Sequence, residues 1–212
     1  MFEKIKFSAE QGDIDAQFSL GRMYCHGNGV TKDYVEAIVW FTKSAKQGSP
    51  EAQNYLGTLY RTGYERVVEG QSKVTIRSGV KFFPKNYEES VNWFKMSAEQ
   101  GLDIAQFNLG LMYSEGKGIT KNDKEALKWF SKSAKQGFPE AQYNLGVSYA
   151  YGVGVPKDCV EAYKWLSLSA SRKNTPPMKN LKKLCLKHIR VISKEMAEEQ
   201  IIKAKDLIQK WE

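Results

Sequence analysis

The strongest constraint on this chain is an internal repeat that recurs in phase along most of its length. A Leu-Gly pair, a tyrosine and a tryptophan return at fixed positions within each copy. Successive copies start 36, 53 and 36 residues apart, so the long spacing equals the period plus 17 inserted residues. A repeat of this length is typical of solenoids, in which similar units stack. Each copy begins with an alanine followed by x-Gln-Gly, at Ala9, Ala45, Ala98 and Ala134.

Each copy predicts two helices. The first begins after the Gln-Gly pair, and Ser49-Pro50 supplies an N-cap followed by proline at the first helical position. It ends at a glycine loop such as Gly27-Asn28-Gly29. The second helix begins at an Asp or Asn with Glu three residues later, a capping-box pattern in which each side chain satisfies a free backbone donor. These starts are Asp33, Asn86, Asn122 and Asp158.

One glycine falls inside the first helix of every copy, which costs about 1 kcal/mol relative to alanine. These glycines are Gly21, Gly57, Gly110 and Gly146. The paired helix carries small residues at one position, namely Ala37, Ser90, Ala126 and Ala162. We therefore expect the two helices to approach closely there. Because such a pair cannot bury its apolar face alone, neighbouring pairs must stack.

The repeat divides the chain into consecutive segments. We expect an N-terminal half-repeat helix, four repeats, an insertion in the second repeat, and C-terminal capping helices. The alternating β-branched and basic residues of the insertion favour a short β-hairpin over 73–83. Either a binding loop or a tolerated surface loop fits it. The segments are 1–8, 9–44, 45–97 with the insertion at about 65–81, 98–133, 134–169 and 170–212.

Four motifs carry a family resemblance: A-x-Q-G, A-Q-x-x-L-G-x-x-Y, G-x-G-[VI] and D/N-x-x-E-[AS]-x-x-W-[FL]. They resemble the Sel1-like repeat family, relatives of the tetratricopeptide repeat, over residues 9–169. The resemblance implies an all-α fold, a right-handed α/α superhelical solenoid of four helix pairs with a C-terminal helical cap. It also implies an adaptor or scaffold that binds a protein or peptide on a concave face. The departures, all in the second repeat, are the insertion, Ser90 in place of alanine, and the missing G-x-G motif.

Two positions of each first helix would face inward if these helices line the concave face, as in tetratricopeptide proteins. Aromatic side chains among polar groups make good anchors for a partner. The alternative is that Phe18, Phe107 and Tyr143 pack only between repeats. We call the whole set the predicted contact positions: Phe18, Arg22, Asn54, Thr58, Phe107, Leu111, Tyr143 and Val147.

Positive charge gathers at the C-terminal end. The net charge is +8, and residues 171–212 hold eleven Lys or Arg against five Asp or Glu. A solvated face explains this most simply, and an acidic protein partner comes next. A nucleic-acid-associated protein is disfavoured, because the tail lacks aromatic side chains other than Trp211. The possible secondary contacts are Arg77, Lys81, Lys182, Lys183 and Lys187.

The sequence offers no catalytic or metal-binding pattern. His26 and His188 are the only histidines, and the three cysteines have no paired spacing, so we expect no enzyme, no cofactor, no metal and no disulfide. The cysteines suggest a reducing compartment, so we expect a cytoplasmic rather than a secreted protein. Residues 1–8 look like the end of a preceding helix, and a removed leader or delivery into a host stays open.

Two versions of the function follow from the sequence. The first is a general adaptor without a transmembrane segment, since no run of about 18 apolar residues occurs. The second is a bacterial immunity or effector-type protein that blocks or recruits one dedicated partner. The sequence names no partner for either.

Overall fold

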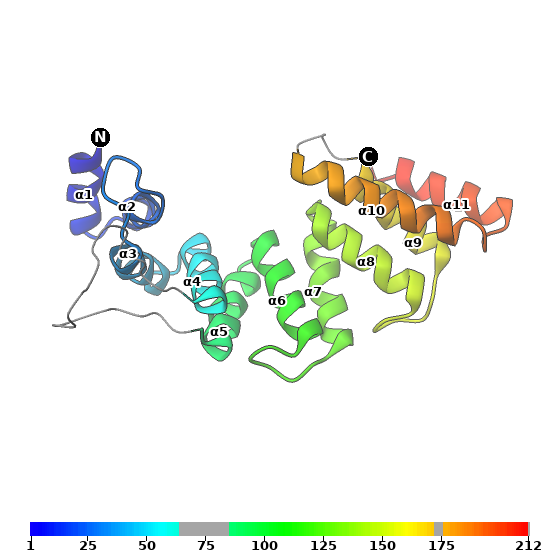
Figure 1. The fold of residues 1–212 in the computed structure, drawn as a ribbon, viewed down its shortest axis with the longest axis horizontal. Coiled ribbons are helices and arrows are strands. Elements are labelled where there is room, and N and C mark those ends of the chain that lie inside the picture. Colours follow the sequence, from blue (N-terminus) through cyan, green and yellow to red (C-terminus); the bar gives the residue numbers. More distant parts are fainter. Residues whose placement is uncertain (64–84, 172–175, 212) are drawn as a thin grey trace, which may run out of the picture. The chain divides into compact units, whose positions relative to one another are not determined.

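The computed structural model describes residues 1–63, 85–171 and 176–211, and all of the regular structure within these ranges is helical. The predicted hairpin at 73–83, with Arg77 and Lys81, lies outside the described residues. The chain forms two compact units, residues 1–102 and 103–212. Figure 1 shows the helices in chain order from blue to red. The all-α class predicted from the sequence is confirmed.

The first unit contains a leading helix and two helix pairs. Helices α2 and α3 pack as one pair and α4 and α5 as the next, while α1 packs against α2 and α3 against α4. Every paired helix here is 13 residues long. The bounds are α1 Phe2–Glu10, α2 Ile14–His26, α3 Tyr34–Lys46, α4 Pro50–Thr62 and α5 Tyr87–Glu99.

The second unit repeats this plan and adds two further helices. Helices α6 and α7 form a pair, α8 and α9 form another, and α7 packs against α8. Helix α10 then packs on α9 and α8, and α11 packs on α9 (Figure 1). The bounds are α6 Asp103–Glu115, α7 Asp123–Lys135, α8 Pro139–Tyr151, α9 Cys159–Ala170, α10 Pro176–Ile192 and α11 Glu198–Gln209.

The N-caps of the second helices are only half as predicted. The Asp or Asn side chain accepts from the first turn, for example from the Glu36 and Glu125 backbone N–H groups. The backbone N–H of each cap residue does not donate to the glutamate side chain, as a full capping box would require. It donates instead to the carbonyl of the repeated tyrosine in the preceding helix. This bond ties the two helices of a pair together. The pairs are Asp33 with Tyr24 (2.9 Å), Asn86 with Tyr60 (2.9 Å), Asn122 with Tyr113 (3.0 Å) and Asp158 with Tyr149 (2.9 Å).

The helical glycines leave room for a large apolar side chain of the paired helix. The small residue on that helix contributes less to the need for glycine. A Cβ added at Gly110 would lie 2.6 Å from the Phe130 ring, and Ala126 meets the same site only through its carbonyl, at 3.3 Å. The other glycines are covered in the same way by Phe41, Phe94 and Leu166. The exceptional Ser90 has its own role, because its Oγ donates to the Gly57 carbonyl at 2.7 Å.

Buried serines link the two helices of each pair at their other end. Each serine sits in the last turn of the second helix and donates to the carbonyl of the first residue of the first helix. They are fully or almost fully buried. The bonds join Ser44 to Ile14 (3.0 Å), Ser97 to Pro50 (2.7 Å), Ser133 to Asp103 (2.8 Å) and Ser169 to Pro139 (2.8 Å).

Buried glutamines add bonds within and between repeats. The Gln53 amide donates to the Ala45 carbonyl of the preceding helix at 3.1 Å, and its oxygen accepts from Gln100 at 2.7 Å. Gln17 makes the same two kinds of bond, with Ala9 and Gln47. Because a buried amide without partners is costly, this arrangement helps to fix how successive pairs stack.

The last helix has no N-cap side chain that accepts a hydrogen bond from its first turn. The Ser193 Oγ, four residues before the N-cap, donates instead to the Ile189 carbonyl at 2.8 Å. The N-cap is Ala197, whose backbone N–H donates to the Gln200 side chain at 3.0 Å. Trp211 follows the helix and lies edge-on to Trp165, with ring centroids 5.0 Å apart. The C-terminal segment therefore covers the last repeat, as a terminal repeat requires.

The glycine–ring contact gives a testable stability prediction. Overpacking costs about 1–3 kcal/mol, which exceeds the gain of about 1 kcal/mol in helix propensity. We therefore expect Gly110→Ala to lower the free energy of unfolding in urea. In a Phe130→Val background the ring is absent, so the same substitution should be neutral or stabilising. An equal loss of stability in both backgrounds would contradict this explanation.

Candidate partner-binding surface

In the first unit, Phe18 is held by aromatic neighbours. Its ring lies 5.8 Å from that of Phe41 and 5.6 Å from that of Tyr55, so it joins α2 to α3 and α4. The Arg22 guanidinium lies 5.9 Å from the Phe18 ring centroid, in cation–π range, and the Arg22 side chain is exposed. Phe18 therefore packs between repeats and at the same time supports an exposed cation.

The two predicted contact positions on α4 differ in exposure. Asn54 is buried, and its backbone carbonyl accepts from the Thr58 Oγ1 at 3.0 Å. Thr58 is half-buried. The sequence analysis expected both side chains on the concave face, where a partner could reach them. The structure buries the Asn54 side chain instead. The asparagine is 6 % exposed, too little for a direct contact with a partner in this conformation.

In the second unit, Phe107 also packs between repeats. Its ring lies 5.9 Å from that of Phe130 within its own pair and 5.1 Å from that of Phe138 in the next repeat. Leu111, one turn further along α6, is half-buried. On α6, the contact surface therefore combines a ring fixed from two sides with a partly accessible leucine.

The last two predicted contact positions, Tyr143 and Val147, lie on α8 and face helix α10 of the C-terminal capping segment. The Tyr143 hydroxyl lies 3.2 Å from Nε2 of His188 on α10, and the Tyr151 hydroxyl lies 3.0 Å from its Nδ1. Both Tyr143 and Val147 pack against the cluster that contains Cys185. Helix α10 thus engages the positions that the sequence assigned to a partner.

The sequence missed this contact for an identifiable reason. Leu184, an apolar residue in the middle of α10, is 44 % exposed. The buried side instead runs through Cys185, His188 and Ile192, at the i, i+3 and i+7 spacing of a helix face. The same spacing can be found in the sequence, but a histidine is not expected on the buried side of a helix, so the pattern is not recognisable as a packed face.

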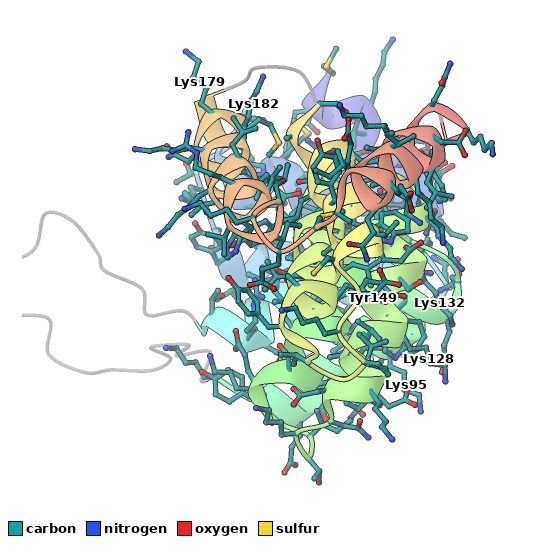
Figure 2. The ribbon with its side chains drawn as sticks, turned by 90° about the vertical axis from the view of Figure 1, so that its right-hand side faces the viewer. Lys95, Lys128, Lys132, Tyr149, Lys179 and Lys182 are labelled. Atoms are coloured by element: carbon teal, nitrogen blue, oxygen red, sulfur yellow. The ribbon has the colours of Figure 1, made fainter. Side chains whose placement is uncertain are left out.

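The predicted basic contacts lie on α10 as far as they are described. Lys183 and Lys187 are exposed, and Lys182 is half-buried. Figure 2 shows Lys182 and the neighbouring Lys179 projecting from this helix, whereas Lys128 and Lys132 lie on α7. The described members of the predicted basic contacts therefore lie on one helix of the second unit.

The residues that the structure describes hold no cluster of metal-ligating side chains. Within residues 1–63, 85–171 and 176–211, no three His, Cys, Asp or Glu side chains gather as a metal site would require. Burial raises the pKa of the Cys25 and Cys185 thiols, which keeps them protonated and poorly nucleophilic. No helix in these ranges is long and apolar enough to span a membrane.

Comparison with known proteins agrees with the repeated geometry. The model of the Sel1 repeat matches residues 14–49, 50–71, 79–102, 103–138 and 139–174. The chain belongs to the Sel1 repeat family. The second and third of these matches carry α4 and α5, which pack as one pair, so the five matched segments correspond to four Sel1 helix pairs.

Two solved structures and one curated relative illustrate the likeness. The protective antigen c5321 of uropathogenic Escherichia coli, which displays an SLR fold, aligns with a TM-score of 0.79 at 33 % identity, covering 99 % of this chain and 40 % of that one. A Sel1 repeat protein of Oxalobacter formigenes aligns with a TM-score of 0.69 at 32 % identity, covering 84 % and 67 %.

The relative is the ERAD-associated E3 ubiquitin-protein ligase component HRD3B of Arabidopsis thaliana, 30 % identical over 56 % of this chain and 16 % of its own length. The chain spans no more than a quarter of the length of this relative and of the other first curated relatives.

The contact between α8 and α10 predicts a pH dependence. Burial, followed by the charge of Lys187, lowers the pKa of His188. The unfolded chain therefore binds a proton more readily than the folded chain as the pH falls through the ordinary pKa of histidine, about 6.5, and stability decreases. We expect the melting temperature to fall more between pH 7.5 and 5.5 for the wild type than for His188→Gln. An equal fall would show that His188 does not report on this contact.

Proposed function

We propose that this Sel1 repeat protein is an adaptor that binds a partner protein through the first helices of its repeats. Sel1 repeat proteins generally mediate protein–protein interaction, and the described residues contain no cluster that could hold a metal ion. HRD3B, by its description, is a component of a ubiquitin ligase assembly. The observation that carries the proposal is the arrangement on α2 and α6, where packed rings lie beside accessible side chains.

In each unit, the proposed contact residue lies beside a ring that is held by packing within that unit. Phe18 and Phe107 each contact a second helix of their own pair and a residue of the next repeat. A side chain that is already ordered loses little conformational entropy when a partner binds. Arg22 is exposed and Leu111 is half-buried, and each lies one turn from one of these rings, so we assign them the direct contacts.

The remaining predicted contact positions take supporting roles in this proposal. Thr58 is half-buried and completes the surface on α4, while Asn54 lies beneath it. Tyr143 and Val147 are engaged by α10, so a partner reaches this end of the second unit through the cap helix rather than through α8.

The test is quantitative capture from a lysate of the source cells with three forms of the full chain. The forms are the wild type, Arg22→Glu with Leu111→Gln on first helices, and Lys128→Glu with Met96→Gln on second helices. The two variants change charge equally, and each alters one residue in each unit. Because substitution in a well-packed contact typically costs 1–2 kcal/mol or more, we expect the first variant to lose about tenfold or more of the captured partner.

The second variant should capture the partner as the wild type does, and melting temperatures should confirm that both variants fold. Equal capture by the two variants would move the interaction away from the first helices. A wild type that captures no partner above a bait-free control would contradict the adaptor function itself.

A further inference from the structure

Helix α10 concentrates positive charge that nothing on the same helix balances. Residues 176–192 contain five basic side chains and no Asp or Glu. In the described part of the chain, none of the five forms an ion pair. Lysines elsewhere in the second unit do so, as Lys157 does with Glu195 and Lys210 with Asp206. The five are Lys179, Lys182, Lys183, Lys187 and Arg190.

The opposite face of α10 holds this charge in a fixed orientation. Cys185 is fully buried, and its Sγ lies 3.4 Å from the Ser169 Oγ on α9. His188 lies between the hydroxyls of Tyr143 and Tyr151 on α8. Lys179 and Lys182 project from this docked helix (Figure 2). Because the helix is already folded and packed, a partner can bind its charges without the segment having to fold first.

Three apolar side chains accompany the charge on the solvent side. Leu184, Leu186 and Val191 are 44 %, 50 % and 45 % exposed. At about 100° per residue, a central basic strip runs along the helix through Lys179, Lys183, Lys187 and Arg190. Leu184 and Val191 lie along one edge of this strip, and Leu186 lies along the other edge, next to Lys182. Exposed apolar side chains beside charges mark a surface on which binding of a complementary molecule is favourable, because it removes apolar area from water.

We propose that the outer face of α10 is a docking site for an acidic segment of the partner protein, with apolar side chains at helical spacing. This proposal rests on the adaptor function proposed above. Carboxylates of the segment pair with the central basic strip, and its apolar side chains cover Leu186 on one side and Leu184 with Val191 on the other. The opposite face of α10 already covers Tyr143 and Val147 of α8.

An anionic membrane fits this face less well than a protein segment does. A helix that lies in a bilayer interface presents one apolar stripe with basic residues at its margins. On α10 the order is reversed, because the basic strip lies between the exposed leucines. Its continuous apolar side, through Cys185 and Ile192, is already buried against the second unit. A flat bilayer cannot cover both edges at once.

Nucleic acid fits less well for a different reason. Single strands gain much of their affinity from bases stacked on aromatic side chains, and α10 has none. Phosphates would meet the basic strip and leave the three apolar side chains uncovered. A protein segment uses both the charges and the apolar side chains.

The probe is a fluorescein-labelled synthetic peptide about as long as α10, rich in glutamate and with leucines at i, i+3, i+4 and i+7. Binding to the full chain is followed by fluorescence anisotropy. We expect Lys183→Glu/Lys187→Glu/Arg190→Glu to raise its Kd about tenfold or more, because close charge pairs are replaced by like-charge contacts. The matched control is Lys124→Glu/Lys128→Glu/Lys135→Glu on α7, all exposed, which should change the Kd less than about threefold.

A second variant separates docking from simple charge attraction. Leu186→Ser leaves the charge unchanged, and we expect it to raise the Kd by about threefold to tenfold through lost apolar burial. Equal effects of the two triple variants, or no effect of Leu186→Ser, would overturn the proposal. So would tighter binding to phosphatidylserine-containing vesicles or to a DNA duplex than to the peptide, if the α10 variant abolished it.

The outcome is distinguishable from that of the adaptor proposal. If the wild type captures a partner in the lysate experiment but the peptide does not bind α10, only the docking face is wrong. If the wild type captures no partner, the adaptor function fails whatever the peptide does.

Discussion

The contact between a helical glycine and a large apolar side chain of the paired helix sets the geometry within each helix pair. A Cβ at Gly21, Gly57 or Gly110 would lie within 2.7 Å of a phenylalanine ring, so only glycine lets the two helices of these pairs approach as they do. Gly146 meets Leu166 in the same way. Each glycine costs about 1 kcal/mol of helix propensity, and the burial of a large side chain offsets that cost.

Polar bonds then fix what the apolar contact leaves free. Hydrogen bonds join the two helices at both ends of each pair, through the serine Oγ at one end and the cap residue N–H at the other. Glutamines such as Gln53 connect successive helices. These bonds hold the helices in place from within the scaffold. The rings of the first helices are therefore already fixed before a partner binds, and the charges of α10 project from a helix that is already docked.

Local signals predicted the helix pairs well, whereas contacts between distant residues could not be deduced. N-caps such as Asp33 and the Gln-Gly ends act within a few residues, so the sequence placed the helix boundaries closely. The sequence analysis assigned Ala126 rather than Phe130 as the partner of Gly110, because both residues recur in phase with the repeat. The engagement of Tyr143 by His188 spans 45 residues and has no repeated signal, and the burial of Asn54 depends on the same kind of three-dimensional packing.

Hydrogen–deuterium exchange of the chain, alone and with its captured partner, tests most directly the claim that first helices and the cap helix form the binding surface. The account predicts added protection in peptides from α2, α6 and α10 when the partner binds. Peptides from α3, α5 and α7 should exchange as they do in the free chain. Protection confined to those second helices, with α2, α6 and α10 unchanged, would contradict it.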